Sequence, residues 1–304
     1  FFFAKVAAQI YAQDGEGTDK THNVAIDTVS GYLYRVGGGS NAMRVYDIRG
    51  NKATAPVYLG SIGDAYVHDA EVITYISGTY TGQQIAFMCR AKSGSHGLEI
   101  YNVTKKNDPK LLSFITWDPV GYSHNVWVDE ATSLAYVSDE LDERHFSIPT
   151  TTHVYDVSRL KNPQYLGSFT NGNSAIGHNH FIRNGFLYAA NYESGARVFD
   201  ISSAISGVQN IVEVAYFDTY MNEKDQANFQ GAWGIYVMPR SGLVVVSDIQ
   251  GGLFILSADL PSSLPLSPSP SPPLPPSTPQ FCPSHWIRLD VSRLPPSLPP
   301  SLPP

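Results

Sequence analysis

Cysteine and charge are both scarce in this chain of 304 residues. It has two cysteines, Cys89 and Cys282, which excludes a disulfide-rich scaffold and most cysteine-based metal sites. Charged residues make up 15% of the chain, against roughly 25% in an average soluble protein. The formal net charge is −7, which is unsuited to coating nucleic acid or an anionic membrane, so we expect no nucleic-acid partner.

Long apolar runs are also missing. No stretch approaches the roughly 20 consecutive apolar residues that a membrane-spanning helix needs, so the sequence predicts no transmembrane segment. The chain begins with Phe1, and no basic and then apolar leader precedes the first strand-like run. We therefore expect this sequence to be a piece of a longer protein.

Proline is rare in the first 260 residues and abundant after them. Of the 22 prolines, 16 lie in residues 261–304. Proline fixes φ and removes a backbone donor, so this stretch favours extended conformations over sheet or helix. We expect residues 259–304 to be a disordered low-complexity tail outside the folded domain, or an artefact of the gene model; a stalk or a ligand for an SH3-type domain is the alternative.

What the chain does contain is a fivefold internal repeat. Five similar segments each carry a marker residue, at spacings of 46, 56, 54 and 55 residues. The markers are His22, His68, His124, His178 and Trp233. Two further short runs rich in Val, Ile, Tyr and Phe follow each marker, and the first four units add another. Such runs, bounded by Gly, Asn, Asp or Pro, predict strands.

Four short strands in a repeat of roughly 40–50 residues or slightly more predict an all-β fold, a β-propeller of four-stranded antiparallel blades. We place the propeller at residues 18–258, with blade units starting near residues 21, 66, 122, 176 and 231. Residues 1–17 are interpreted as the remnant of a preceding blade. Residues 3–11 would supply the strand that the fifth unit lacks and close a five-bladed ring; a fragment of a six-bladed parent is the alternative.

The third strand of the first four units ends in a side chain typical of turns. These residues are Asp47, Asn102, Asp156 and Asp200. Asp and Asn accept a backbone N–H two residues further on. We predict a role in hairpins for them, and no carboxylate site.

The amino-acid sequences of the repeats are as specific as their spacing. The most telling stretches are YSHNVWVDEATSLAYVSDELDE, THVYDVSRLKNPQYLGSFT, GHNHFIRNGFLYAANYESGARVFDIS and FQGAWGIYVMPRSGLVVVSDIQGGLFIL. Over roughly residues 18–257 the chain resembles the LVIVD-repeat proteins called choice-of-anchor B. The resemblance implies an extracellular, cell-surface or periplasmic propeller without established catalysis. We expect a monomer that binds a protein or glycan at one propeller face.

The marker histidines form the first candidate site. The first strand of a propeller blade lines the central channel, so these side chains would form a ring at one channel end, with Trp233 as an axial aromatic residue. Neutral imidazoles are good ligands for Zn, Cu, Fe or Ni. The alternative is that each histidine only hydrogen-bonds the neighbouring blade. His180 breaks the repeat and is a candidate additional ligand.

An acidic segment after the second strand of the third unit is the second candidate. Asp139, Glu140, Asp142 and Glu143 place four carboxylates in five residues, a donor type that suits Ca²⁺. The segment lacks the spacing of a dedicated calcium loop, and a solvated charged loop is the alternative. Asp248 stands at the matching point of the fifth unit, which suggests that Asp139 is partly a turn residue.

The function that these observations favour is a non-enzymatic binding module. A metal-dependent enzyme that uses the histidine ring, with Zn or Ca as the divalent metal, is the first alternative. A glycoside hydrolase is the second, and needs two carboxyls about 5–10 Å apart across the channel. The inner-strand candidates for that pair are Asp27, Asp69, Glu71 and Asp129.

Overall fold

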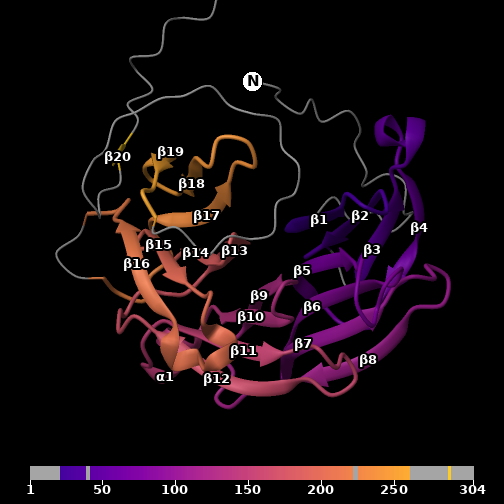
Figure 1. Ribbon diagram of the computed structural model, residues 1–304, viewed down its shortest axis with the longest axis horizontal. Coiled ribbons are helices and arrows are strands. Elements are labelled where there is room, and N and C mark those ends of the chain that lie inside the picture. Colours follow the sequence, from indigo (N-terminus) through magenta and orange to yellow (C-terminus); the bar gives the residue numbers. More distant parts are fainter. Residues whose placement is uncertain (1–20, 39–41, 222–224, 261–286, 289–304) are drawn as a thin grey trace, which may run out of the picture.

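The computed structural model describes residues 21–38, 42–221, 225–260 and 287–288. These residues form five sheets, each of four antiparallel strands. The sheets lie side by side around a common centre as the blades of a five-bladed β-propeller (Figure 1). The all-β propeller predicted from the sequence is confirmed.

Each blade runs in chain order from its innermost to its outermost strand. The first blade holds β1 (Asn23–Asp27), β2 (Tyr32–Val36), β3 (Met43–Asp47) and β4 (Val57–Ile62). The second holds β5 (Val67–Thr74), β6 (Gln84–Lys92), β7 (Ser95–Asn102) and β8 (Lys110–Ile115). The third holds β9 (Ser123–Asp129), β10 (Leu134–Asp139), β11 (Thr151–Asp156) and β12 (Gln164–Thr170).

The fourth and fifth blades complete the arrangement. The fourth holds β13 (Asn179–Arg183), β14 (Phe186–Ala190), β15 (Ala196–Asp200) and β16 (Val212–Phe217). The fifth holds β17 (Ala232–Val237), β18 (Val244–Asp248), β19 (Gly252–Ser257) and β20 (Ile287–Arg288). Each of the five predicted marker segments thus overlaps the innermost strand of one blade.

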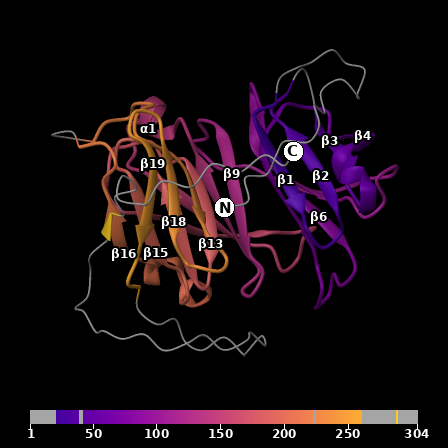
Figure 2. The same ribbon diagram turned by 90° about the horizontal axis from the view of Figure 1, so that it is seen from above.

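Helical segments are few and short within the described ranges. The helix α1 (Asp142–Phe146) follows β10, and the 3-10 turns η2 (Gly50–Thr54), η3 (Ala204–Ser206) and η4 (Val208–Asn210) precede outer strands. Seen from above, α1 lies beside one end of the strands (Figure 2). A search of the described residues finds no helix long and apolar enough to cross a membrane.

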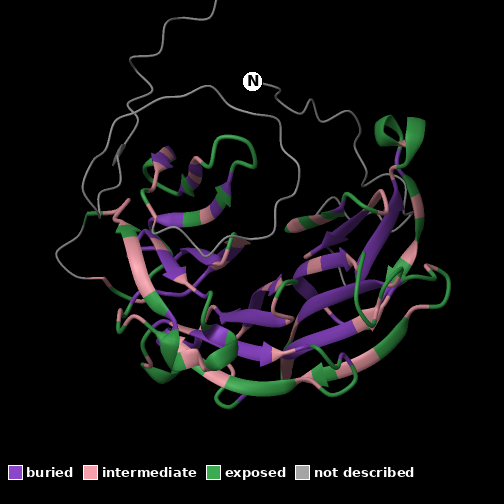
Figure 3. Ribbon diagram, viewed as in Figure 1, coloured by how far each residue is buried: buried purple, intermediate pink, exposed green. Residues whose placement is uncertain are grey.

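The hydrophobic core lies between neighbouring blades. Four clusters join the five blades in succession. In one of them Phe87 and Ile100 of the second blade meet Val126 and Val137 of the third. Inner and middle strands are therefore mostly buried, and outer strands are largely exposed (Figure 3). Each large apolar side chain buried in this way stabilises the fold by roughly 1.5–3 kcal/mol, so blade-to-blade packing holds the inner strands in place.

The predicted turn chemistry is confirmed. Asp47, Asn102, Asp156 and Asp200 each accept a hydrogen bond of 2.8–3.0 Å from the backbone N–H two residues further on. These side chains fix the turn that leads to the outer strand. Their side-chain oxygens are used locally, in these turns.

The fifth blade requires a correction to the predicted tail. β20 lies within the tail and pairs antiparallel with β19, with Ile287 opposite Ser257 and Arg288 opposite Leu256. It falls in the proline-free stretch 284–294, where backbone N–H groups remain available for a sheet. The tail therefore supplies the fourth strand that the fifth unit lacked. The roles predicted for residues 1–17, including closure of the ring by residues 3–11, lie outside the described residues.

Candidate metal centre

Four histidines form a continuous row at one end of the inner strands. His22 and His178 immediately precede β1 and β13, and His68 and His124 are the second residues of β5 and β9. The ring centroids are 4.1 Å apart for His22 and His68, and 4.3 Å apart for each following pair. Equal register in successive blades thus brings four imidazoles into ring-to-ring contact. His22 is exposed, whereas the other three are buried.

Hydrogen bonds to the next blade set the tautomer of these rings. Nδ1 of His68 donates to the carbonyl of His124 at 3.2 Å, and Nδ1 of His178 donates to the carbonyl of Trp233 at 2.6 Å. A carbonyl accepts only, so Nδ1 carries the proton in both rings. A neutral imidazole then presents the lone pair of Nε2 as a free ligand, an arrangement typical of histidines that bind metal ions.

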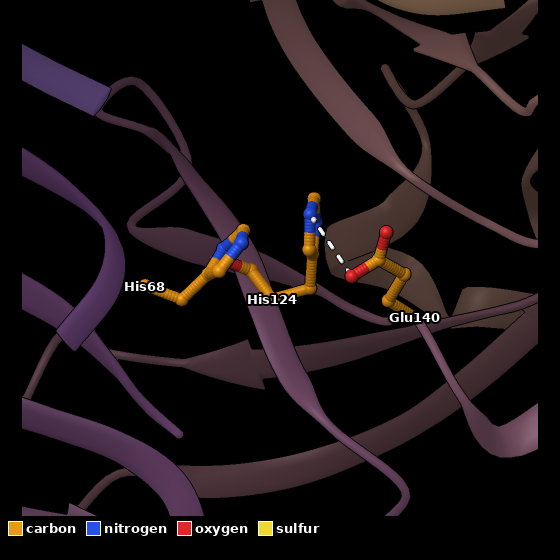
Figure 4. A group of neighbouring side chains, drawn as sticks. All are labelled: His68, His124 and Glu140. Carbon is orange, nitrogen blue, oxygen red and sulfur yellow. Dashed lines mark hydrogen bonds and ion pairs between the residues drawn. The ribbon is translucent and has the colours of Figure 1, made fainter. Parts of the chain in front are cut away.

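Glu140 lies against the same row. It follows β10, and its carboxylate oxygens lie 3.6 Å from Nε2 of His124 and 3.5 Å from Nε2 of His178. The hydroxyl of Tyr192 donates a 2.8 Å hydrogen bond to its Oε1 and holds the carboxylate in place. Both ring nitrogens of His124 are buried and have no hydrogen-bond partner among the described residues. Figure 4 shows the His124 ring between His68 and Glu140.

Burial keeps the imidazoles neutral. It lowers the pKa of His68 to about 4 and of His178 to about 3, and holds the pKa of His124 well below its ordinary value. Burial, with a smaller contribution from the neighbouring carboxylates, raises the pKa of Glu140 to about 7, although the hydrogen bond from Tyr192 lowers it. A carboxylate oxygen of Glu140 therefore faces the lone pair on Nε2 of His178. Such contacts are unfavourable unless a proton or a metal cation lies between them.

The donor atoms are close enough to share one ion. One atom each from His68, His124 and Glu140 lie within 4.8 Å of one another, the one such group of three or more His, Cys, Asp or Glu side chains within the described ranges. Ligands to Zn²⁺ lie about 2.0–2.1 Å from the ion, so pairs of them are about 3–4 Å apart. The separation of His124 and Glu140 already meets this requirement. A contraction of about 1 Å brings in the remaining donor.

The rest of the acidic segment does not converge with Glu140. Asp139 is buried, and its two oxygens accept hydrogen bonds from the indole N–H of Trp117 and from three backbone N–H groups. Asp248 likewise accepts hydrogen bonds from two backbone N–H groups in the fifth blade. Both are turn residues, as their matching positions suggested. The four carboxylates therefore form no common calcium site among the described residues.

Asp142 and Glu143 are buried at the start of α1, so the segment is not a solvated loop. Oε1 of Glu143 accepts a hydrogen bond from the backbone N–H of Gly177. Burial raises the pKa of Asp142 to about 10, with Glu143 adding to the effect, so this pair retains a proton at neutral pH. The pair supports the loop behind Glu140.

The other predicted site residues lie beside the row. The ring centroid of Trp233 is 6.1 Å from that of His178, and its side chain is about half exposed. His180 is buried on the neighbouring stretch of β13, where its Nε2 lies 3.4 Å from the hydroxyl of Thr152. His180 is therefore separate from the cluster of ligand atoms.

The inner-strand acids considered for glycoside hydrolysis separate into two kinds. Asp27 and Asp129 accept hydrogen bonds from nearby side-chain hydroxyls and from backbone N–H groups two residues on, as turn residues do. Asp69 and Glu71 line the channel.

Sequence reasoning did not assign Glu140 to the histidine row and did not single out Tyr192. A signal for both was available. The second strands LAYVSD and FLYAAN occupy matching positions, and the next residue is Glu140 in one unit and Tyr192 in the other. A repeat that aligns four histidines also aligns the residues that face them.

Comparisons with known proteins add the fold alone. No protein-family model and no curated protein matches the chain. Among solved structures it is similar to the periplasmic gluconolactonase PpgL of Pseudomonas aeruginosa, with a TM-score of 0.55 and 11% identity over 79% of this chain and 69% of that chain. It is also similar to a functionally unknown protein from Desulfotomaculum acetoxidans, with a TM-score of 0.50 and 10% identity over 77% of this chain and 70% of that one. Likeness at this level of identity shows a shared fold and carries no activity with it.

Proposed function

We propose that this propeller is a metal-dependent binding module, with a divalent metal ion at the histidine end of its channel. His68, His124 and Glu140 would hold the ion. The observation that carries the proposal is the contact between Glu140 and the Nε2 atoms of His124 and His178, at 3.6 and 3.5 Å. Because Nδ1 of His178 donates to Trp233, its Nε2 carries a lone pair, and a carboxylate that faces this lone pair creates a local preference for a cation.

The donor set favours an ion of the zinc class over calcium. Imidazole nitrogen suits Zn, Cu, Fe and Ni, whereas Ca²⁺ takes six to eight oxygen ligands. Two imidazoles and one carboxylate are also a common set for a zinc site with an open position. The backbone carbonyl of His124 fixes Nδ1 of His68 and so orients this ligand, as outer-shell partners do in metalloproteins.

An open position on the ion would take an oxygen atom of the ligand. We propose that this ligand is a protein or glycan and that it docks on the propeller face where the four histidines lie. The resemblance to the LVIVD-repeat family supports this choice of ligand. We also propose, on the same basis, that the protein is a monomer at an extracellular or cell-surface location. The half-exposed indole of Trp233 lies beside the row and offers a flat apolar surface to such a ligand.

Metal-dependent hydrolysis is the second candidate. One observation favours it: Glu140 has a pKa of about 7, and general bases work best when their pKa is close to the operating pH, so in an enzyme Glu140 would serve as the base in place of a metal ligand. The structural neighbour named as a gluconolactonase supplies the assay, hydrolysis of a sugar lactone. Turnover that depends on added metal and is lost in Glu140→Gln would favour the enzyme over the binding module.

Metal content and affinity test the proposal. Purified protein loaded with Zn²⁺ and dialysed should retain one ion per chain, measured by plasma mass spectrometry. Titration calorimetry should show at least about a hundredfold weaker binding for Glu140→Gln, since a lost ligand costs more than the 10–100-fold typical of an outer-shell change. His145→Ala is the matched control, because this exposed histidine on α1 lies near Glu140 in sequence and outside the cluster. Equal affinity of the two variants would overturn the proposal.

A further inference from the structure

The central channel contains a second candidate site beyond the histidine row. A cavity of about 360 Å³ is lined by the inner strands of all five blades. This size lies within the roughly 300–1,000 Å³ range of small-molecule sites. In each blade the residues that line the cavity start one position after the marker residue. None of the proposed metal ligands is among them.

One level of this cavity departs from the repeat. The third residue after each marker is Ala25, Glu71, Trp127, Phe181 and Tyr236 in successive blades, and all five line the cavity. The histidine row repeats one residue type in four blades. This level instead combines a small residue, an acid and three aromatic residues. Different residue types at equivalent positions are what recognition of an asymmetric ligand requires.

The aromatic side of this level is continuous. The ring centroids of Trp127 and Phe181 are 4.7 Å apart, and those of Phe181 and Tyr236 are also 4.7 Å apart, both pairs at 62°. These edge contacts fix the orientation of the rings. Trp127 and Tyr236 keep part of their surface exposed. Indole and phenol faces attract cations within about 6 Å of the ring centroid.

The second blade adds two acids to the cavity, next to the strand that bears Trp127. Oε2 of Glu71 accepts a hydrogen bond of 2.6 Å from the backbone N–H of Val128, and Asp69 accepts one of 2.7 Å from the amide of Asn125. Neither Lys nor Arg is among the described residues that line the cavity. Burial raises the pKa of Asp69 to about 6 and the pKa of Glu71 well above its ordinary value. Among the described residues, the two carboxyls thus have no cationic partner in the cavity.

We propose that this cavity binds a small organic ammonium ion. The charged nitrogen would pair with the Glu71 carboxylate, with Asp69 adding to the negative potential. Its alkyl groups would face the row Trp127, Phe181 and Tyr236. A bare metal ion would use the acids but leave the aromatic side without a function.

A comparison of two ligands of equal shape tests this assignment. Choline and its uncharged isostere 3,3-dimethylbutan-1-ol are titrated into the protein by calorimetry, with glucose as a third ligand. We expect choline to bind at least roughly tenfold more tightly than the other two, since 1.4 kcal/mol of cation–π and charge attraction corresponds to tenfold. Equal binding of the uncharged alcohol, tighter binding of glucose, or no binding of choline would overturn the proposal.

Variants of the lining residues locate the site. Glu71→Gln keeps an acceptor for the N–H of Val128 and removes the charge, so choline affinity should fall at least tenfold while the fold is retained. Tyr236→Leu should also weaken binding, and its partly exposed position tolerates the change. Glu130→Gln is the matched control, because this nearby exposed acid lies outside the cavity lining. Thermal unfolding by circular dichroism verifies that each variant is folded, and equal choline affinity of Glu71→Gln and Glu130→Gln would refute the role of Glu71.

Discussion

His178 donates a hydrogen bond from Nδ1 to the carbonyl of Trp233, 2.6 Å away and one blade further on. His68 makes the equivalent bond to His124. In both rings the bond joins neighbouring inner strands, and in His178 it also leaves Nε2, which lies 3.5 Å from Glu140, unprotonated. The predicted alternatives for the ring, blade-to-blade hydrogen bonding and metal ligation, are compatible because they use different nitrogens of one imidazole.

Tyr192 positions Glu140, so its hydroxyl should matter to metal binding. Tyr192→Phe removes the 2.8 Å hydrogen bond and leaves the aromatic packing. Loss of such an outer-shell partner typically weakens metal affinity by about 10–100-fold. Competition with a zinc chelator of known affinity measures the effect. Tyr58→Phe, on the outer strand β4 of the first blade, should leave the affinity unchanged. A Tyr192→Phe affinity equal to that of the wild type would mean that Glu140 needs no support or is no ligand.

Metal affinity should depend on pH through Glu140. Its pKa of about 7 means that a proton competes with the metal ion below that pH. We expect affinity to fall about tenfold per pH unit below pH 7, with little change between pH 8 and 9. His68 adds a second proton only near pH 4. Affinity that is constant between pH 5 and 8 would contradict this assignment, and Glu140→Gln should flatten the profile.

The raised pKa of Glu140 also predicts that the metal-free protein loses stability toward unfolding as the pH rises. In the unfolded chain Glu140 loses its proton near its ordinary pKa of 4.5, whereas in the folded chain it does so near 7. Stability is therefore highest below pH 4.5 as far as this group is concerned, and it falls as pH rises to 7. Above pH 7 the cost is on the order of 3 kcal/mol.

Glu140→Gln removes this titration, so the metal-free variant should be more stable than the metal-free wild type at pH 8. Urea unfolding at pH 5 and pH 8 in the presence of a chelator measures the difference. Saturating Zn²⁺ should reverse the order, because the ion stabilises only the protein that binds it. A variant less stable than the wild type at both pH values would exclude an unfavourable charge at this position.

The close approach of Gly121 to the acidic segment gives a packing prediction. A Cβ at this position would lie 2.7 Å from backbone atoms of Leu141 and Asp142 and 2.8 Å from Oδ1 of Asp139. Gly121→Ala should therefore destabilise the protein by about 1–3 kcal/mol and weaken metal binding by displacing Glu140. Gly177→Ala, where the nearest atoms are at 3.2 Å and beyond, should cost less. Equal urea midpoints for the two variants would contradict this account of the loop.

The fold could be predicted because its signals are local and repeated. The marker segments and the turn residues Asp47, Asn102, Asp156 and Asp200 each report on one blade, and five copies reinforce one another. β20 was missed because its pairing joins residues about 30 positions apart along the chain and its segment is surrounded by proline.

The candidate site was only partly predictable for a related reason. The histidines were found because they repeat at one register. Glu140 was assigned to a calcium loop because four acids adjoin in sequence, whereas the fold gives them different surroundings: Asp139 accepts backbone N–H groups, and Glu140 faces the histidines. Contacts between blades depend on the direction in which each side chain points at the end of its strand. The spacing of residues along the sequence does not determine this direction.

The measurement that tests the metal centre most directly is anomalous X-ray diffraction at the zinc edge from crystals grown with Zn²⁺ at pH 8. The account predicts one strong peak among Nε2 of His68, Nε2 of His124 and the Glu140 carboxylate, at about 2.0–2.2 Å from each. A map of equal quality with no peak at that position, or with zinc bound only elsewhere, would contradict the central claim.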